Sequence, residues 1–189
     1  DTAQYKQSPR EDYYLTFSRL VSAKRTETIV KAFNETDKEL VVGGTGPEKE
    51  RLEKIARENV EFVGYMSEEE KIRRLGETQA LIFNAKNEDF GMVPVEAFAS
   101  GTPVLGVADG YTKYQIENGK NGFLHDPTPE SIRESVDLLE EQGVGWSRAD
   151  IQDFAERYST ERFNQKIKAI VEEVVEDVKI SPTDGWEGS

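Results

Sequence analysis

The sequence contains no cysteine and only one histidine, His125. Without cysteine the chain can form neither a disulfide nor a thiolate metal site, and it has no thiolate nucleophile. A single histidine cannot supply the several imidazole ligands of a multi-histidine metal centre. We interpret His125 as a surface loop residue rather than as a catalyst. The composition therefore excludes thiolate chemistry and a multi-histidine metal centre.

Positive charge and long apolar runs are also scarce. The 189 residues include 24 Lys and Arg against 37 Asp and Glu, which gives a formal net charge of −13. This excess disfavours binding to nucleic acid or to anionic lipid, because each requires a positive surface. No apolar run approaches the roughly 20 residues that span a bilayer. With 36% hydrophobic and 32% charged residues, the composition is typical of one folded domain.

The two ends of the chain differ in composition from its centre. The first residue is Asp rather than Met, and residues 1–12 lack the basic and apolar regions of a signal peptide. Residues 179–189 are rich in Gly, Ser and Pro. We expect a flexible tail at 1–12, one domain at 13–178 and a second tail at 179–189. We also expect a cytoplasmic location and a piece of a longer protein.

Short apolar runs alternate with amphipathic segments through the centre of the chain. This alternation is typical of βαβ units, which build a parallel sheet flanked by helices. Six segments have the character of strands: 13–18, 39–42, 61–63, 80–83, 103–107 and 122–124. Seven others have helical spacing: 25–33, 48–58, 67–77, 94–100, 130–141, 148–158 and 161–178. The sequence therefore predicts an α/β fold with a Rossmann-like parallel sheet.

Two cations follow the first predicted strand. Open parallel sheets bind ligands outside the carboxyl ends of their strands, so the loops that follow the strands are the expected binding site. Arg19 and Lys24 lie five residues apart in the first of these loops, in an otherwise acidic chain. The forked guanidinium and the mobile ammonium could together neutralise a diphosphate. Two solvated surface cations are the alternative interpretation.

A glycine-rich turn, Val42-Gly43-Gly44-Thr45-Gly46-Pro47, follows the second predicted strand. It does not match the dinucleotide-binding fingerprint, because Lys49 occupies the place of the third glycine, and it lacks the Gly-Lys-Ser/Thr of a P-loop. We expect these glycines to serve the backbone geometry of the turn. Direct contact with a ligand is the alternative.

Two carboxylates follow the fourth predicted strand. Glu88 and Glu96 have seven residues between them, and a helix is expected to begin near Pro94, with Glu96 in its first turn. A carboxylate accepts two hydrogen bonds, so Glu96 could bind both hydroxyls of a ribose, while Glu88 reaches hydroxyls further along the ligand. Considered alone, the pair could equally be two solvated glutamates at a helix start.

Backbone groups between the two carboxylates complete this candidate site. Gly91 permits a close approach of the backbone to a ligand. The amides of Met92 and Val93, unpaired at the start of a helix, favour an anion. An anionic ligand that carries hydroxyl groups is therefore expected here.

Five motifs, in this order, resemble the retaining nucleotide-sugar glycosyltransferases of the GT-B architecture known as glycosyltransferase family 4. They are S-R-L-V-S-A-K at 18–24, V-G-G-T-G-P at 42–47, F-V-G-Y-M-S at 62–67, E-D-F-G-M-V-P-V-E-A-F-A-S-G-T-P-V at 88–104 and N-G-K-N-G-F-L at 118–124. The resemblance covers about residues 13–175. It corresponds to the C-terminal, donor-binding half of that architecture, and it implies that an N-terminal, acceptor-binding half is missing.

The resemblance implies an activity as well as a fold. It implies transfer of a hexose, mannose or glucose, from a GDP- or UDP-sugar to a glycan or lipid-linked acceptor, without a cofactor. Without the acceptor-binding half, the chain alone is expected to transfer no sugar. Peripheral association with the cytoplasmic face of a membrane is expected only through that missing half.

The resemblance also implies roles for the charged residues. Arg19 and Lys24 match the pair that holds the donor diphosphate, and Glu88 matches the glutamate near the transferred sugar; these three are the expected catalytic residues. Glu96 matches the glutamate that binds the nucleotide ribose. In this family, cations and amides of the protein stabilise the leaving group, so no divalent metal is implied.

Five further residues are implied to bind the donor. Gly91, Met92 and Val93 match backbone contacts to phosphate and sugar. Tyr65 and Met66 occupy the loop whose backbone borders the base.

The chain departs from the family pattern after the fifth predicted strand. Where Gly-Gly-x-x-Glu is common, it has Ala-Asp-Gly-Tyr-Thr-Lys-Tyr at 108–114. The loop that faces the sugar is therefore expected to be bulkier, or the acceptor to be unusual.

Two other classes of function stay open. A non-catalytic nucleotide-sugar-binding or scaffold module could have the same fold, because fold does not fix function. A dinucleotide-binding oxidoreductase domain is disfavoured by Lys49 and by the lack of an acidic residue at the end of the second strand. Binding of a nucleoside diphosphate but not of NAD would exclude the oxidoreductase.

Overall fold

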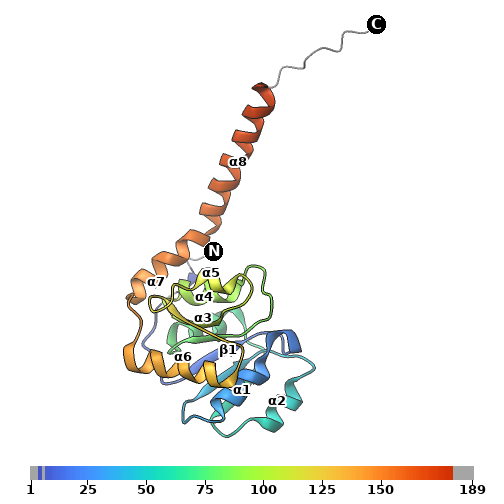
Figure 1. The fold of residues 1–189 in the computed structure, drawn as a ribbon, viewed down its shortest axis with the longest axis vertical. Helices are drawn as coiled ribbons and strands as arrows, with labels where there is room; N and C mark the ends of the chain where they lie inside the picture. The colour runs from blue at the N-terminus through green and yellow to red at the C-terminus, as the bar shows by residue number, and fades with distance from the viewer. Residues whose placement is uncertain (1–3, 6, 181–189) are drawn as a thin grey trace.

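A six-stranded parallel sheet forms the centre of the structure, a computed structural model that describes residues 4–5 and 7–180 (Figure 1). Its strands are β1 (Tyr14–Phe17), β2 (Leu40–Gly43), β3 (Val60–Gly64), β4 (Leu81–Phe83), β5 (Val104–Val107) and β6 (Gly122–His125). They are arranged in the order β3-β2-β1-β4-β5-β6, and the pairings are parallel. The predicted α/β, Rossmann-like fold is confirmed, and each predicted strand is correct to within one residue at either end.

Helices connect the strands and close the chain. They are α1 (Thr26–Phe33), α2 (Lys49–Ile55), α3 (Glu68–Glu77), α4 (Met92–Ala99), α5 (Thr112–Gln115), α6 (Pro129–Gln142), α7 (Arg148–Ala155), α8 (Thr160–Ile180) and the short 3-10 segments η2 (Ser22–Lys24) and η3 (Glu156–Tyr158). The short helix α5 was not predicted, because four residues are too few to show a helical period.

The helix α4 begins at Met92, two residues before the predicted start near Pro94. Proline is tolerated in the first turn of a helix because the first four amides have no partner within the helix. Pro94 therefore lies inside the first turn, and Glu96 falls in the second turn rather than in the first.

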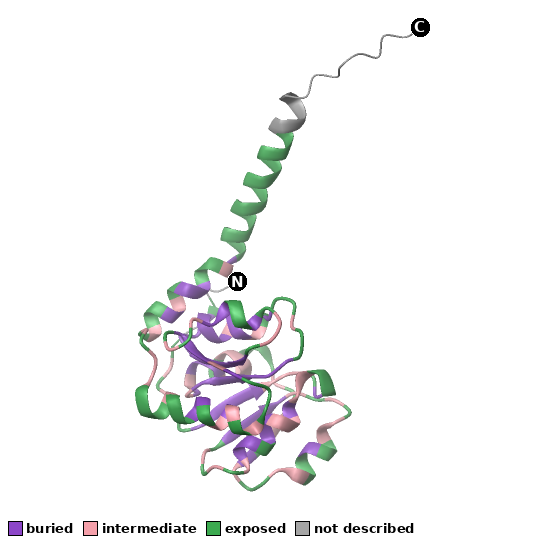
Figure 2. Ribbon diagram, viewed as in Figure 1, coloured by how far each residue is buried: buried purple, intermediate pink, exposed green. Residues whose placement is uncertain are grey.

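The strands of the sheet are mostly buried (Figure 2). Their consecutive side chains point to opposite faces and pack in two different clusters. Leu15 and Val41 pack in the cluster that includes α3, α4 and α7. Tyr14 and Val42 pack in the other cluster, with α1, α2 and α6. Each strand contributes side chains to both clusters. Its consecutive residues are therefore mostly apolar, and the strands appear in the sequence as continuous apolar runs.

The segment before β1 packs against the domain, although a flexible tail is predicted at 1–12. Tyr5 is only 7% exposed. The Arg10 guanidinium donates hydrogen bonds to three backbone carbonyls, those of Thr78, Gln79 and Gly101. The polar composition of the segment does not reveal these two anchors, because their partners lie far away in the sequence.

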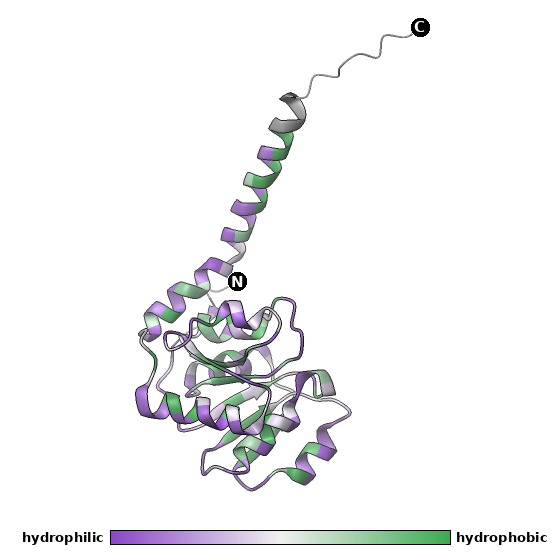
Figure 3. Ribbon diagram, viewed as in Figure 1, coloured by the Kyte–Doolittle hydropathy of each residue, from purple (hydrophilic) through white to green (hydrophobic). Residues whose placement is uncertain are grey.

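The helix α8 extends away from the sheet (Figure 1). Hydrophobic and hydrophilic residues alternate along this helix (Figure 3). Its large apolar side chains are between 45% and 62% exposed: Phe163, Ile167, Ile170, Val171, Val174 and Val175. Among the described helices, α8 included, none is long and apolar enough to cross a membrane. Of the second predicted tail, 179–189, residues 181–189 lie outside the described residues.

His125 ends β6 and is only 2% exposed, so its interpretation as a surface loop residue is wrong. The strand runs one residue further than predicted, and the Ala108 amide donates to the His125 carbonyl at 2.9 Å. The ring Nδ1 lies 2.8 Å from the Asp126 carbonyl oxygen. Burial lowers the pKa of His125, because it disfavours the charged imidazolium.

Replacement of Arg10 by Met should lower the free energy of unfolding by about 2 kcal/mol, because three carbonyls lose a charged donor. Urea unfolding followed by circular dichroism measures this change. Arg162→Met is the matched control, since Arg162 is exposed on α8. Equal effects of the two substitutions would show that the segment before β1 contributes nothing to stability.

Stability should fall as the pH drops below about 6.5, the usual pKa of an unfolded histidine. The folded pKa of His125 is lower, so the unfolded state binds more protons there and is favoured. The loss of stability should grow as the pH falls further through this range. His125 is the sole histidine, so urea unfolding of His125→Gln should show a flatter pH dependence over that interval. Identical slopes for the two proteins would contradict the assignment.

Candidate functional site

The order of the strands reverses between β1 and β4, which are neighbours in the sheet. From β1 the next strands, β2 and β3, are added on one side, and from β4 the strands β5 and β6 are added on the other. In open parallel sheets, the crevice outside the carboxyl ends of two such strands is the usual place for a ligand. The loop after β1, residues 18–25, and the loop after β4, residues 84–91, meet there. The Lys86 amide donates to the Ala23 carbonyl at 2.8 Å and joins the two loops.

Lys24 and Glu88 form an ion pair across this junction. The Lys24 Nζ lies 2.6 Å from the Glu88 Oε2, although the residues are 64 positions apart in the sequence. Their side chains are 32% and 24% exposed. Two of the predicted site residues are thus brought together, and each neutralises the charge of the other.

Arg19 is exposed and lines a cavity of about 420 Å³ beside the same junction. Its guanidinium forms no hydrogen bond or ion pair with any residue in the described part of the chain. The predicted residues Tyr65 and Met66 line the same cavity, and Tyr65 is 79% exposed. The cavity therefore combines a cation without a partner with an exposed aromatic ring.

The glycine-rich turn after β2 forms one wall of this cavity. Gly44 has a φ of +114°, and a Cβ there would lie 1.8 Å from the carbonyl oxygen of Ser18. The Leu20 amide donates to the Thr45 carbonyl at 2.9 Å, which fixes the turn against the loop after β1. The expected role of the glycines in backbone geometry is confirmed, and the turn also lines the cavity.

Glu96 is held by a residue that the sequence patterns did not indicate, Lys71. The Lys71 Nζ lies 2.9 Å from the Glu96 Oε1 and 2.8 Å from the Glu68 Oε2. Burial alone would lower the pKa of Lys71, but hydrogen bonds to these two glutamates outweigh it and raise the pKa. Glu96 therefore lies beside a side chain that stays positively charged. This charge stabilises the carboxylate, which in the second turn of α4 gains less from the helix N-terminus than it would in the first turn.

Lys71 owes its position to the start of α3. Ser67 caps this helix, since its hydroxyl accepts a hydrogen bond from the Glu70 amide at 3.1 Å. The sequence could have indicated Lys71 in one way only. Lys71 lies in the first turn of a helix that follows β3, at the same edge of the sheet as the loops after β1 and β4.

The start of α4 presents backbone amides toward the loop after β4. Gly91 is the N-cap residue, with a φ of +72°, and it has no side chain to cap the amides of Met92 and Val93. The buried side chain of Gln115 donates to the carbonyls of Phe90 and Gly91, at 2.7 and 3.2 Å. This brace from α5 holds the loop in place, and the amides remain available to an anion.

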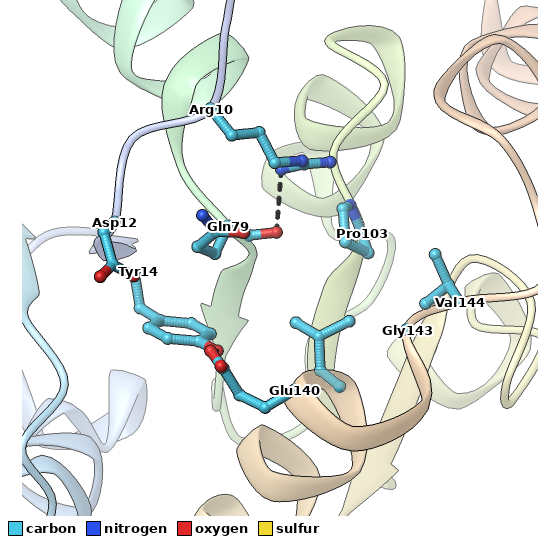
Figure 4. A pocket seen from close by; sticks show the side chains of 9 residues that line it. Arg10, Asp12, Tyr14, Gln79, Pro103, Glu140, Gly143 and Val144 are labelled. Atoms are coloured by element: carbon cyan, nitrogen blue, oxygen red, sulfur yellow. Dashed lines mark hydrogen bonds between the residues drawn. The ribbon is translucent and has the colours of Figure 1, made fainter.

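A second cavity, of about 300 Å³, lies at the opposite edge, where β1 and β4 begin (Figure 4). Its polar groups bind one another. Arg10 donates to the Gln79 carbonyl at 2.9 Å, and the Tyr14 hydroxyl donates to Glu140 at 2.5 Å. The pairing of these groups and the distance from the carboxyl ends of the strands make this cavity the weaker candidate.

Two curated relatives match most of this chain. The UDP-N-acetylglucosamine–peptide N-acetylglucosaminyltransferase GtfA subunit of Streptococcus pneumoniae serotype 4 is 27% identical over 86% of this chain and 36% of the relative. The N-acetyl-alpha-D-glucosaminyl L-malate synthase of Bacillus anthracis is 23% identical over 93% of this chain and 49% of the relative. The chain therefore spans between about a third and a half of the length of these relatives.

The fold has solved counterparts as well. The Anabaena protein Alr3699/HepE, crystallised in complex with UDP-glucose, superposes with a TM-score of 0.80 at 21% identity, over 92% of this chain and 55% of that one. The sequence model of the family described as Glycosyl transferases group 1 matches residues 1–162. Since that match covers most of the sequence, the chain belongs to the group 1 glycosyltransferases, and its sheet is the Rossmann-like domain of their GT-B neighbours.

Proposed function

We propose that this chain binds the donor of a retaining, metal-independent glycosyltransferase, a nucleoside-diphosphate hexose. The observation that carries the proposal is the meeting of Lys24 and Glu88 at 2.6 Å outside the carboxyl ends of β1 and β4. A diphosphate needs a cation at this place, and a sugar hydroxyl needs an acceptor next to it.

The diphosphate binds between Arg19, Lys24 and the start of α4. Arg19 is free to form a two-pronged contact with phosphate oxygens. When the diphosphate enters, Lys24 exchanges the Glu88 carboxylate for phosphate oxygens. The amides of Met92 and Val93 supply uncharged donors beside the two cations.

The exchange at Lys24 has a consequence for Glu88. Its carboxylate loses a cation as the diphosphate binds, and it becomes a free acceptor for the hydroxyls of the transferred sugar. Glu88 thus positions the sugar and is not assigned as a nucleophile.

The ribose lies near Glu96 in this proposal. Lys71 occupies the Oε1 of that carboxylate, and Oε2 has no hydrogen-bond partner among the described residues. A ribose hydroxyl can therefore donate to Oε2 without displacing Lys71. The base then lies in the cavity that Tyr65 and Met66 line.

Transfer breaks the bond between the anomeric carbon and the diphosphate oxygen, which keeps the electron pair, and forms a bond from that carbon to an acceptor oxygen, whose proton passes to the departing diphosphate. Negative charge develops on the departing phosphate, where Arg19 and Lys24 stabilise it. Each charged hydrogen bond could contribute about 1.5 to 3 kcal/mol. Acceptor binding is assigned to a second half of the enzyme, in keeping with the share of the relatives that this chain spans.

UDP or GDP should bind this chain in the presence of EDTA, and NAD should not. Isothermal titration calorimetry with and without the chelator measures this binding. Arg19→Ala should lower the affinity for the nucleotide by about ten- to a hundredfold. Lys166→Ala on α8 is the control. Binding that vanishes with EDTA, or that Arg19→Ala leaves unchanged, would refute the proposed diphosphate site.

The two glutamates should separate nucleotide from sugar binding. Glu96→Gln should lower the affinity for UDP by about ten- to a hundredfold, because the side-chain amide would present an N–H donor to a ribose hydroxyl that is itself a donor. Glu88→Gln should not lower the affinity for UDP, because it weakens the ion pair that holds Lys24, and it should lower the affinity for UDP-glucose relative to UDP.

Calorimetric titration of both ligands tests this division of roles, with Glu58→Gln as the control for an exposed glutamate. Circular dichroism verifies that each variant is folded. Equal losses of UDP affinity in Glu88→Gln and Glu96→Gln would show that the assigned roles are wrong.

A further inference from the structure

Three aromatic side chains with exposed rings lie next to Glu88. Phe90 is 40% exposed, Tyr111 37% and Tyr114 68%. The rings of Phe90 and Tyr111 stack with centroids 5.6 Å apart, and those of Tyr111 and Tyr114 lie 5.8 Å apart at a tilt of 53°. A buried aromatic ring is stabilised by apolar contacts on both faces, whereas much of Tyr114 faces solvent. An exposed aromatic cluster of this kind marks a binding surface.

These tyrosines share a cavity of about 250 Å³ with acceptor groups. Its lining consists of Asn87, Glu88, Asp89, Gly110, Tyr111 and Tyr114. The carboxylates can accept hydrogen bonds from hydroxyls, and the amide of Asn87 can donate as well as accept. The cavity thus offers apolar ring surface and polar acceptors to the same ligand.

The backbone fixes the tyrosines relative to Glu88. The Tyr111 amide donates to the Glu88 carbonyl at 2.8 Å. Gly110, with a φ of +54°, lies so close that a Cβ there would be 2.6 Å from the Glu88 amide nitrogen. On the other side, the Arg25 guanidinium binds the Asp109 carboxylate at 3.1 Å. The loop after β5 is therefore fastened both to the loop after β4 and to the start of α1.

The ligand that suits this surface is a pyranose ring. One face of such a ring presents C–H groups, which pack against an aromatic face, while its edge carries hydroxyls that donate to carboxylates. A second phosphate is a poor match, because Glu88 and Asp89 are negative. Lys113 Nζ lies 5.1 Å from the centroid of Tyr114, and it leaves that side chain largely exposed.

We propose that Tyr111 and Tyr114 form a stacking subsite for a pyranose ring beside Glu88. This inference rests on the proposed function, because it extends the sugar-binding side of the same site. It also accounts for the departure from Gly-Gly-x-x-Glu at 108–114, where this chain has two tyrosines. The ring belongs either to the donor or to a carbohydrate acceptor, and the experiment distinguishes these sources.

The test compares the wild-type chain with Tyr114→Ala, Tyr114→Phe and the control Phe163→Ala, an exposed aromatic on α8. In the first arm, calorimetry measures the affinity for UDP and for UDP-glucose. In the second arm, saturation-transfer NMR detects the ring protons of methyl α-glucopyranoside and methyl α-mannopyranoside with saturating UDP present. Circular dichroism verifies that the variants are folded.

If the sugar of the nucleotide-sugar donor occupies the subsite, Tyr114→Ala should lower the affinity for UDP-glucose by about two- to tenfold and leave the affinity for UDP unchanged. If the sugar of an acceptor occupies the subsite, Tyr114→Ala should abolish only the saturation-transfer signal of the methyl glycosides. In either case Tyr114→Phe, which keeps the ring face, and Phe163→Ala should behave as the wild type.

The subsite is refuted if Tyr114→Ala changes neither arm, or if Tyr114→Phe is as defective as Tyr114→Ala. Failure of the proposed function gives a different result, in which the wild type binds neither UDP nor GDP. A glycoside signal that depends on Tyr114 would then still support the subsite as a carbohydrate site without a nucleotide donor.

Discussion

The parallel pairing of β1 with β4 is the constraint on which the site depends. Leu15 and Leu81 are the paired residues, and both are fully buried. The pairing brings the loops that follow these two strands to the same edge of the sheet, since parallel strands end on the same side. Cations come from one loop and carboxylates from the other. The pairing thus brings Lys24 and Glu88, which are 64 positions apart in the sequence, within 2.6 Å of each other.

Charge is distributed in keeping with this arrangement. The chain is strongly acidic, yet Arg19, Lys24, Arg25 and Lys71 all lie along the carboxyl edge of β1 or on the neighbouring helix α3. Three of these cations pair with carboxylates of the site or of its supporting loop, and Arg19 alone is left open. A site of this kind attracts an anion at short range only, because the rest of the surface repels it.

The strands and the meeting of the two loops could be predicted because they depend on local signals. Apolar runs mark the strands, and the rule for open parallel sheets then places Arg19, Lys24 and Glu88 at one edge. The roles of these residues as donor contacts stay a prediction, as do those of Gly91, Met92 and Val93. The dinucleotide-binding oxidoreductase is no longer an alternative, since the chain belongs to a glycosyltransferase family.

The features that were missed depend on contacts between distant segments. Lys71 gains its role from Glu96, 25 residues away, and no local pattern records such a pair. His125 is buried as the last residue of β6, which pairs with Val107 of β5, a strand partner that lies 18 positions away in the sequence. Tyr5 and Arg10 lie in a segment whose composition is typical of a tail, and only their partners show that these two residues pack against the domain. Burial of this type is a tertiary property.

The close approach of Gly44 to Ser18 bears on how this site can evolve. A Cβ at Gly44 would collide with the backbone of the loop after β1, and one at Gly46 would lie 2.3 Å from the Leu20 carbonyl oxygen. Neither glycine can therefore gain a side chain unless the backbone of the loop after β1 moves in the same step. Around this cavity, exposed positions such as Tyr65 are freer to vary, while the contact between the two loops is inherited as one unit.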